Sequence, residues 1–283
     1  MKRTVFCTLA LLLALLLALL TPVTANSAPT RLDGVGGSAL EVDENCPVTV
    51  SAETLTFRID GEGDYGQLSA QVTAVYQMEN PTDKVLTVPM AFYLEERKGQ
   101  VGGGLDLDEV SITADGQALS FTQQEVEQDD PGRERTALVY TVDFSAGGSR
   151  EVAVSYPSLS YSVRDGTTVW THTFTYLLSP AQHWAHFGTL DVEISTPEKA
   201  PYIIDSTLHL EKAEGRHYTA HFDGLPEGEL EFTLYSKPSI TLMDRANVWF
   251  QNVRYALIIL WPLLLLIVLI AAFGIFVRRQ RKR

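Results

Sequence analysis

The chain has 283 residues, of which 45% are hydrophobic, and it carries a formal net charge of −13. This length allows about one or two domains and excludes a large multidomain enzyme. Seven of the 22 basic residues flank the apolar segments at the two ends, so the region between them holds 15 basic against 35 acidic residues and is expected not to bind nucleic acid.

Residues 1–25 are typical of a secretory signal peptide. Two basic residues precede an apolar stretch from Val5 to Leu20, and Thr21-Pro22 and small residues follow it. This pattern predicts cleavage after Ala25. The 16 apolar residues also approach the lower length of a spanning helix, so an uncleaved N-terminal anchor is the alternative.

Residues 26–46 are rich in Gly, Ser and acidic residues and show no sustained apolar period. This composition predicts a flexible leader. Cys46 at its end is the one cysteine left after removal of the signal peptide, so the exported region holds no intrachain disulfide. A buried or free thiol is the simplest expectation, and an intermolecular disulfide is the alternative.

From residue 47 onward the apolar period becomes two. It is clearest in 68–79, where Tyr76 and Met78 are expected to face a core and Gln77 and Glu79 to face outward. Hairpin-like turn signals such as 114–117 separate about ten such segments, and no amphipathic helix precedes the last apolar stretch. The pattern predicts an all-β protein, an antiparallel β-sandwich, and excludes nucleotide-binding α/β folds.

We expect two small sandwiches, residues 47–157 and 166–237, because the strand ending at Tyr156 gives way to a Ser-rich stretch. The second would be short. One continuous sandwich is therefore the alternative.

An acidic turn near the end of the first long strand is a calcium candidate. Asp60, Glu62 and Asp64 alternate with glycines and could supply clustered oxygen ligands, the type that Ca²⁺ prefers. The EF-hand spacing is not met, because Tyr65 stands at the sixth position and Gln71 at the twelfth. A solvated acidic hairpin without metal is the more ordinary interpretation, and no cofactor is predicted.

Two segments combine strand patterns with a distinct turn. The first is Val75–Val85 with its Asn80-Pro81 turn, followed by Val88-Pro89-Met90. The second is Phe174–Pro180 followed by Trp184–Ile194. Both segments resemble the ectodomains of uncharacterised bacterial single-pass membrane proteins with immunoglobulin-like β-sandwiches. The resemblance is architectural and implies a β-sandwich surface protein; it carries over no catalytic residue.

All six histidines lie between 172 and 221, so a metal site is one hypothesis. His217 and His221 share strand parity, and His209 lies on a preceding strand, so three imidazoles could share one solvent face. Ordinary polar-face residues explain the same pattern. His183 and His186 flank Trp184 and are better explained by packing.

Residues 256–277 form an uncharged segment of 22 residues, about 33 Å long as a helix, which is enough to span a bilayer core of about 30 Å. Five of the six residues in 278–283 are basic and predict a cytoplasmic tail. The expected topology is therefore single-pass type I in the cell membrane, with an extracytoplasmic ectodomain and a juxtamembrane stem at 238–255.

These features predict a non-enzymatic surface protein whose acidic ectodomain binds another protein or a cell-envelope component. No nucleophile elbow or catalytic-cysteine context is present. The alternative is an extracytoplasmic hydrolase or metal-dependent enzyme that uses loop carboxylates or histidines. A pocket that gathers such groups would favour the enzyme, and a flat or apolar exposed face would favour the binding module.

Overall fold

The computed structural model describes residues 24–31, 41–62, 66–97, 106–126, 133–164, 167, 169–247, 249–250, 253–254 and 260–261. The chain separates into two compact units. The first contains residues up to Val163 together with Thr171–Pro238, and the second contains Arg164–Trp170 together with the chain from Ser239 onward.

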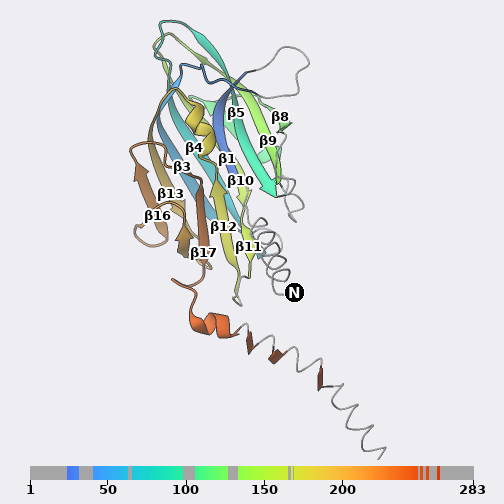
Figure 1. The fold of residues 1–283 in the computed structure, drawn as a ribbon. Helices are drawn as coiled ribbons and strands as arrows, with labels where there is room; N and C mark the ends of the chain where they lie inside the picture. The colour runs from blue at the N-terminus through green and yellow to red at the C-terminus, as the bar shows by residue number, and fades with distance from the viewer. Residues whose placement is uncertain are drawn as a thin grey trace, which may run out of the picture. The chain divides into compact units, whose positions relative to one another are not determined.

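The first unit is mostly β and contains three sheets (Figure 1). The largest has eight strands in the order β15-β16-β13-β3-β4-β10-β6-β7. All of its pairs are antiparallel except β13 with β3, which is parallel. Its strands are β3 (Thr49–Glu62), β4 (Leu68–Glu79), β6 (Ser111–Ala114), β7 (Gln117–Ala118), β10 (Ser149–Leu159), β13 (Phe187–Ser195), β15 (Glu211–Lys212) and β16 (His217–Phe222).

Two smaller antiparallel sheets complete the unit, with the orders β2-β1-β5-β9-β8 and β11-β12-β17-β14. Short 3-10 helices lie at Leu107–Glu109 (η2) and Ser179–His183 (η3). The strands of the two sheets are β1 (Thr24–Arg31), β2 (Glu41–Val42), β5 (Leu86–Arg97), β8 (Thr122–Val126), β9 (Arg133–Phe144), β11 (Tyr161–Val163), β12 (Thr171–Tyr176), β14 (Tyr202–Ser206) and β17 (Leu230–Tyr235).

The core lies between the eight-stranded sheet and the two smaller ones. Phe57 of β3 packs edge-on against Phe232 of β17, with ring centroids 5.1 Å apart, and Phe92 of β5 contacts Tyr156 of β10 at 5.3 Å. Each ring pair joins the large sheet to one of the small sheets. The result is a two-layer arrangement in which most buried apolar side chains form one cluster.

The alternation predicted for residues 68–79 is confirmed. In β4, Tyr76 and Met78 are buried, whereas Gln77 and Glu79 are exposed. The hairpin signal at 114–117 is also confirmed, since Asp115 and Gly116 take φ values of 48° and 75° between β6 and β7. Positive φ at both central residues is the backbone conformation that favours Asp-Gly in a two-residue hairpin.

The first residues of the expected flexible leader, 26–31, belong to the strand β1 (Thr24–Arg31). This strand pairs with β5 on one side and with β2 on the other, and Asn26, Ser27, Ala28 and Thr30 are buried. Its residues are mostly small and polar and show no apolar alternation. Backbone pairing with the neighbouring strands therefore fixes its position. Cys46 is free and buried, as expected.

The two halves expected as separate sandwiches share one sheet. β13, from the second half, pairs with β3, from the first, over the register Phe187–Ser195 with Val50–Arg58. The alternative of one continuous sandwich describes this arrangement.

A β-bulge in β3 changes which side chains face the core. The β3–β4 register shifts between Val50 and Ala52, so the buried set passes from Val48 and Val50 to Glu53, Leu55 and Phe57. Gly188 of β13 lies against this bulge. A Cβ there would lie 2.0 Å from the backbone oxygen of Ser51, so a side chain would displace one of the two strands.

The second unit contains a helical segment that begins at residue 242. Thr241 caps it: the backbone N–H and hydroxyl of Thr241 donate to Asp244, and the Asp244 N–H donates back to the Thr241 hydroxyl. Within the described part of the chain, no helix is long and apolar enough to cross a membrane. The predicted span at 256–277 lies outside the described residues except for Leu260 and Trp261, which are helical.

Candidate functional site

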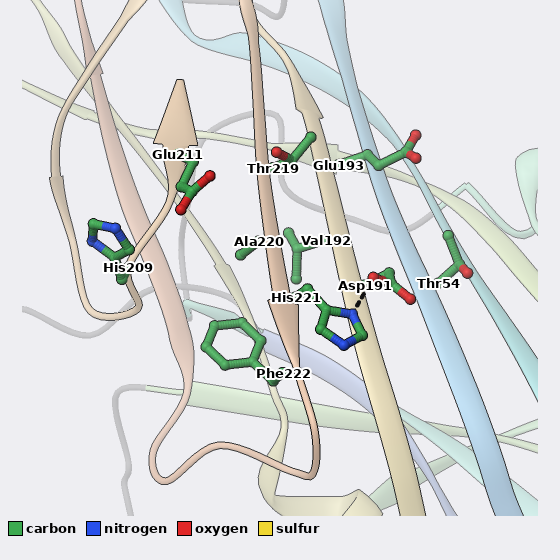
Figure 2. Close-up of a pocket in the computed structure, with 10 residues that line it drawn as sticks. All are labelled: Thr54, Asp191, Val192, Glu193, His209, Glu211, Thr219, Ala220, His221 and Phe222. Carbon is green, nitrogen blue, oxygen red and sulfur yellow. Dashed lines mark hydrogen bonds and ion pairs between the residues drawn. The ribbon is translucent and has the colours of Figure 1, made fainter. Parts of the chain in front are cut away.

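A pocket of about 560 Å³ lies on the outward face of the eight-stranded sheet, over β3, β13, β16 and the segment that leads into β15 (Figure 2). Strand alternation places its polar lining. In β13, Leu190, Val192 and Ile194 are buried in the core, so Asp191 and Glu193 point outward.

The carboxylate of Asp191 and the imidazole of His221 form the centre of the pocket. These residues are cross-strand partners in the β13–β16 pair, and His221 Nδ1 lies 2.7 Å from Asp191 Oδ1 (Figure 2). His221 Nε2 lies 3.3 Å from Asp223 Oδ1. The hydrogen bonds to Asp191 and then to Asp223 raise the pKa of His221, because both ring nitrogens can donate only in the imidazolium form.

The opposite wall of the pocket carries His209 and Glu211, with Thr219 of β16 between the two walls (Figure 2). Glu211 is the cross-strand partner of Thr219, and Thr219 is the partner of Glu193. The pocket therefore has carboxylates on both sides, with two imidazoles among them.

The prediction that histidines of this region share a solvent face is confirmed in part. His209 and His221 line the pocket, whereas His217 is exposed on the same strand but contacts the Ser195 hydroxyl, at 3.0 Å from Nδ1. Within the described residues, no group of three His, Cys, Asp or Glu side chains is arranged to hold a metal ion. The pocket therefore offers ionisable groups but no ready metal centre.

The remaining histidines lie elsewhere. His172 of β12 is buried, and its Nδ1 lies 2.7 Å from the Ser162 hydroxyl. Burial and, secondly, the charge of Lys199 lower the pKa of His172 to about 4, so its imidazole is neutral at physiological pH. His183 lies 3.5 Å from Glu44.

The calcium candidate is described only at its first residue. Asp60 is exposed near the end of β3, whereas the side chain of Glu62 and all of Asp64 lie outside the described residues. The calcium hypothesis therefore stays a prediction.

A buried polar network between the sheets was not anticipated from the sequence. Tyr176 of β12 donates to Glu53 Oε1 at 2.8 Å, the Tyr176 and Tyr76 hydroxyls are 2.9 Å apart, and Tyr76 donates to Asn26 Oδ1 at 2.7 Å. All four side chains are fully buried. The network thus joins β1, β3, β4 and β12, which come from all three sheets.

Glu53 is the group in this network that is least satisfied. Its Oε2 and the Nδ2 of Asn26 have no hydrogen-bonding partner among the described residues. Burial raises the pKa of Glu53 to about 7, and the hydrogen bond from Tyr176 opposes that rise only in part. The sequence contains a signal for the burial of Glu53. Apolar residues have even numbers at Val48 and Val50 and odd numbers at Leu55 and Phe57, so the core-facing parity changes before residue 55.

Comparisons with known proteins show the fold alone. No known protein family matches the chain, and no curated protein does. A candidate nutrient-binding protein from Legionella pneumophila aligns with a TM-score of 0.54 and 13% identity over 76% of this chain and 73% of that chain. A two-domain M1 zinc metallopeptidase has a TM-score of 0.32 at 12% identity over 72% of this chain and 46% of that chain. The M1 zinc metallopeptidase of Deinococcus radiodurans has a TM-score of 0.30 and 12% identity, over 67% of this chain and 42% of that chain.

Proposed function

We propose that this protein is a single-pass, type I membrane protein with an extracytoplasmic, immunoglobulin-like β-sandwich that binds another protein or a cell-envelope component. The apolar segments at 1–25 and 256–277 and the basic residues of 278–283 support the anchoring and its direction. The mostly β first unit supports a binding ectodomain.

The observation that carries the binding role is the pocket on the outward sheet face. Asp191, Glu193 and Glu211 place negative charge on two of its walls, and the ectodomain around it is acidic. An ammonium or guanidinium group of the bound molecule complements such a lining. The pocket therefore fits a partner that presents a cationic side chain or amine.

The test places a photo-crosslinking amino acid in the full chain in its native membrane. One variant carries it at Thr219, inside the pocket, and the control carries it at Thr141, which is exposed on β9. We expect a discrete adduct from Thr219 that disappears when Asp191→Asn and Glu193→Gln are added. Identical adducts from both positions, or adducts that persist in the double variant, would contradict the proposal.

A second candidate, an extracytoplasmic hydrolase, is favoured by the hydrogen-bonded pair of Asp191 and His221. A carboxylate on one imidazole nitrogen is the orienting half of a catalytic triad, whose other nitrogen contacts a nucleophilic hydroxyl. Here that nitrogen faces the Asp223 carboxylate instead. Hydrolysis of p-nitrophenyl acetate by the purified full chain, lost on His221→Gln, would favour this candidate over the binding module.

A further inference from the structure

Exposed apolar surface is concentrated in one part of the described chain. Eight large apolar side chains are exposed among the described residues, and seven of them belong to the second unit. The exception is Val85, in the turn between β4 and β5. The seven are Val169, Leu242, Met243, Trp249, Phe250, Leu260 and Trp261.

One of these residues, Val169, is distant in sequence from the others and belongs to the connection between β11 and β12. The register of the four-stranded sheet fixes where this connection lies. Val163 pairs with Thr171, and His172 pairs with Leu234, so β11 ends, β12 begins and β17 ends at one edge of the first unit. The chain toward the helix therefore leaves from the same end as the β11–β12 connection.

The chain between the end of β17 and the helical segment is short. Five residues, 236–240, separate the end of β17 from Thr241, the cap of the helical segment. Such a link spans at most about 18 Å when fully extended. The start of the helix is therefore held within reach of the β11–β12 connection, and both belong to one compact unit.

The connection presents groups suited to a lipid interface. The Arg164 guanidinium lies over the Trp170 ring, 4.5 Å from its centroid, and the Thr167 hydroxyl donates to the Val169 carbonyl at 2.5 Å. Val169 is 39% exposed. Tryptophan beside an arginine suits the headgroup region, where the indole is half solvated and the guanidinium can contact phosphate.

We propose that the β11–β12 connection is a second membrane contact, in which Arg164, Val169 and Trp170 enter the headgroup layer of the phospholipid bilayer beside the anchoring helix. This inference rests on the proposed membrane anchor. Trp249 and Phe250, farther along the helical segment, are also exposed, and their ring centroids lie 5.1 Å apart. Contact at two points restricts the tilt of the ectodomain relative to the bilayer.

The test is a depth measurement by electron paramagnetic resonance on the full chain, in a Cys7→Ser background, in phosphatidylcholine vesicles. Buried Cys46 stays unlabelled, and a nitroxide is attached at Val169→Cys, at Trp249→Cys or at the control Val85→Cys. We expect the nitroxides at 169 and 249 to be relaxed more by oxygen than by a water-soluble nickel chelate. The nitroxide at 85 should show the opposite preference.

The outcomes separate the two proposals. A water-like value at 169 with a lipid-like value at 249 overturns the second contact and leaves the anchor standing. Water-like values at both positions overturn the second contact alone, because Trp249 lies in the predicted stem before the span. The anchor is overturned only if the full chain also fails to co-sediment with the vesicles. Arg164→Glu should lower the ratio of oxygen to nickel relaxation at 169 toward the ratio at 85. The ratio at 249 should not change, because only the connection loses its contact with phosphate.

Discussion

Glu53→Gln should remove a pH-dependent instability from the core. The folded-state pKa of Glu53 is about 7, against an ordinary value of 4.5, because the carboxyl is fully buried. The folded state therefore binds a proton more tightly than the unfolded state. Stability from this group is fully present below pH 4.5 and is lost as pH rises through 7, by about 3 kcal/mol for a difference of this size.

Glutamine has the shape of the protonated carboxyl and cannot ionise. We expect Glu53→Gln to be similar to the wild type near pH 5 and more stable at pH 8, by up to about 3 kcal/mol. The assay is thermal unfolding of the full chain in detergent, followed by circular dichroism between pH 5 and 8.

Glu79→Gln is the matched control, since Glu79 lies at the exposed end of β4. It should leave the pH dependence of unfolding unchanged. An unaltered fall in stability between pH 5 and 8 in Glu53→Gln would refute the reasoning.

Other predictions follow from groups of the same core and from the ends of the chain. The pKa of His172 is lowered to about 4, so its unfolded form binds protons first and stability falls as pH drops from about 6.5 toward 4; His172→Gln should flatten that acid limb of the unfolding profile. Tyr76→Asp removes a buried ring, costs about 3 kcal/mol or more and should unfold the first unit, whereas exposed Gln77→Asp should leave the melting temperature nearly unchanged. Sodium chloride at matched ionic strength should reproduce any stabilisation by millimolar calcium, and a saturable calcium-selective shift in melting temperature that Asp60→Asn with Asp64→Asn abolishes would instead establish the site. Protease added outside intact cells should digest the ectodomain and leave a small membrane fragment with the basic tail, and a protected ectodomain would contradict the topology.

Strand parity could be predicted from the sequence because one face of each strand packs on the core. In β4 the alternate positions from Leu68 through Tyr76 to Met78 are all buried, as the alternation predicts, and Val75 on the opposite face is only half-buried. The turn at Asp115-Gly116 was predictable for a local reason, since those residue types tolerate positive φ. Both features depend on residues that are close in sequence.

Long-range pairing explains what could not be predicted. β1 has no apolar alternation, and its place depends on β5, about 65 residues later, and on the hydrogen bond from Tyr76 to Asn26. The bulge at Ser51 depends on Gly188 of β13, which lets the two backbones approach. Glu53 reaches the core only through that bulge.

The residues of the pocket could be predicted from the sequence only in part, because their positions depend on strand parity and on strand pairing. Parity alone places His221 and Thr219 on one face of β16, but the carboxylates that join them depend on the pairing of β16 with β13 and with β15. The site is therefore defined by the pairing of neighbouring strands, and its charged groups are half-buried or exposed. Screening by salt should weaken a partner held in this pocket. The apolar contacts proposed for Val169 and Trp249 should persist, so ionic strength separates partner binding from membrane contact.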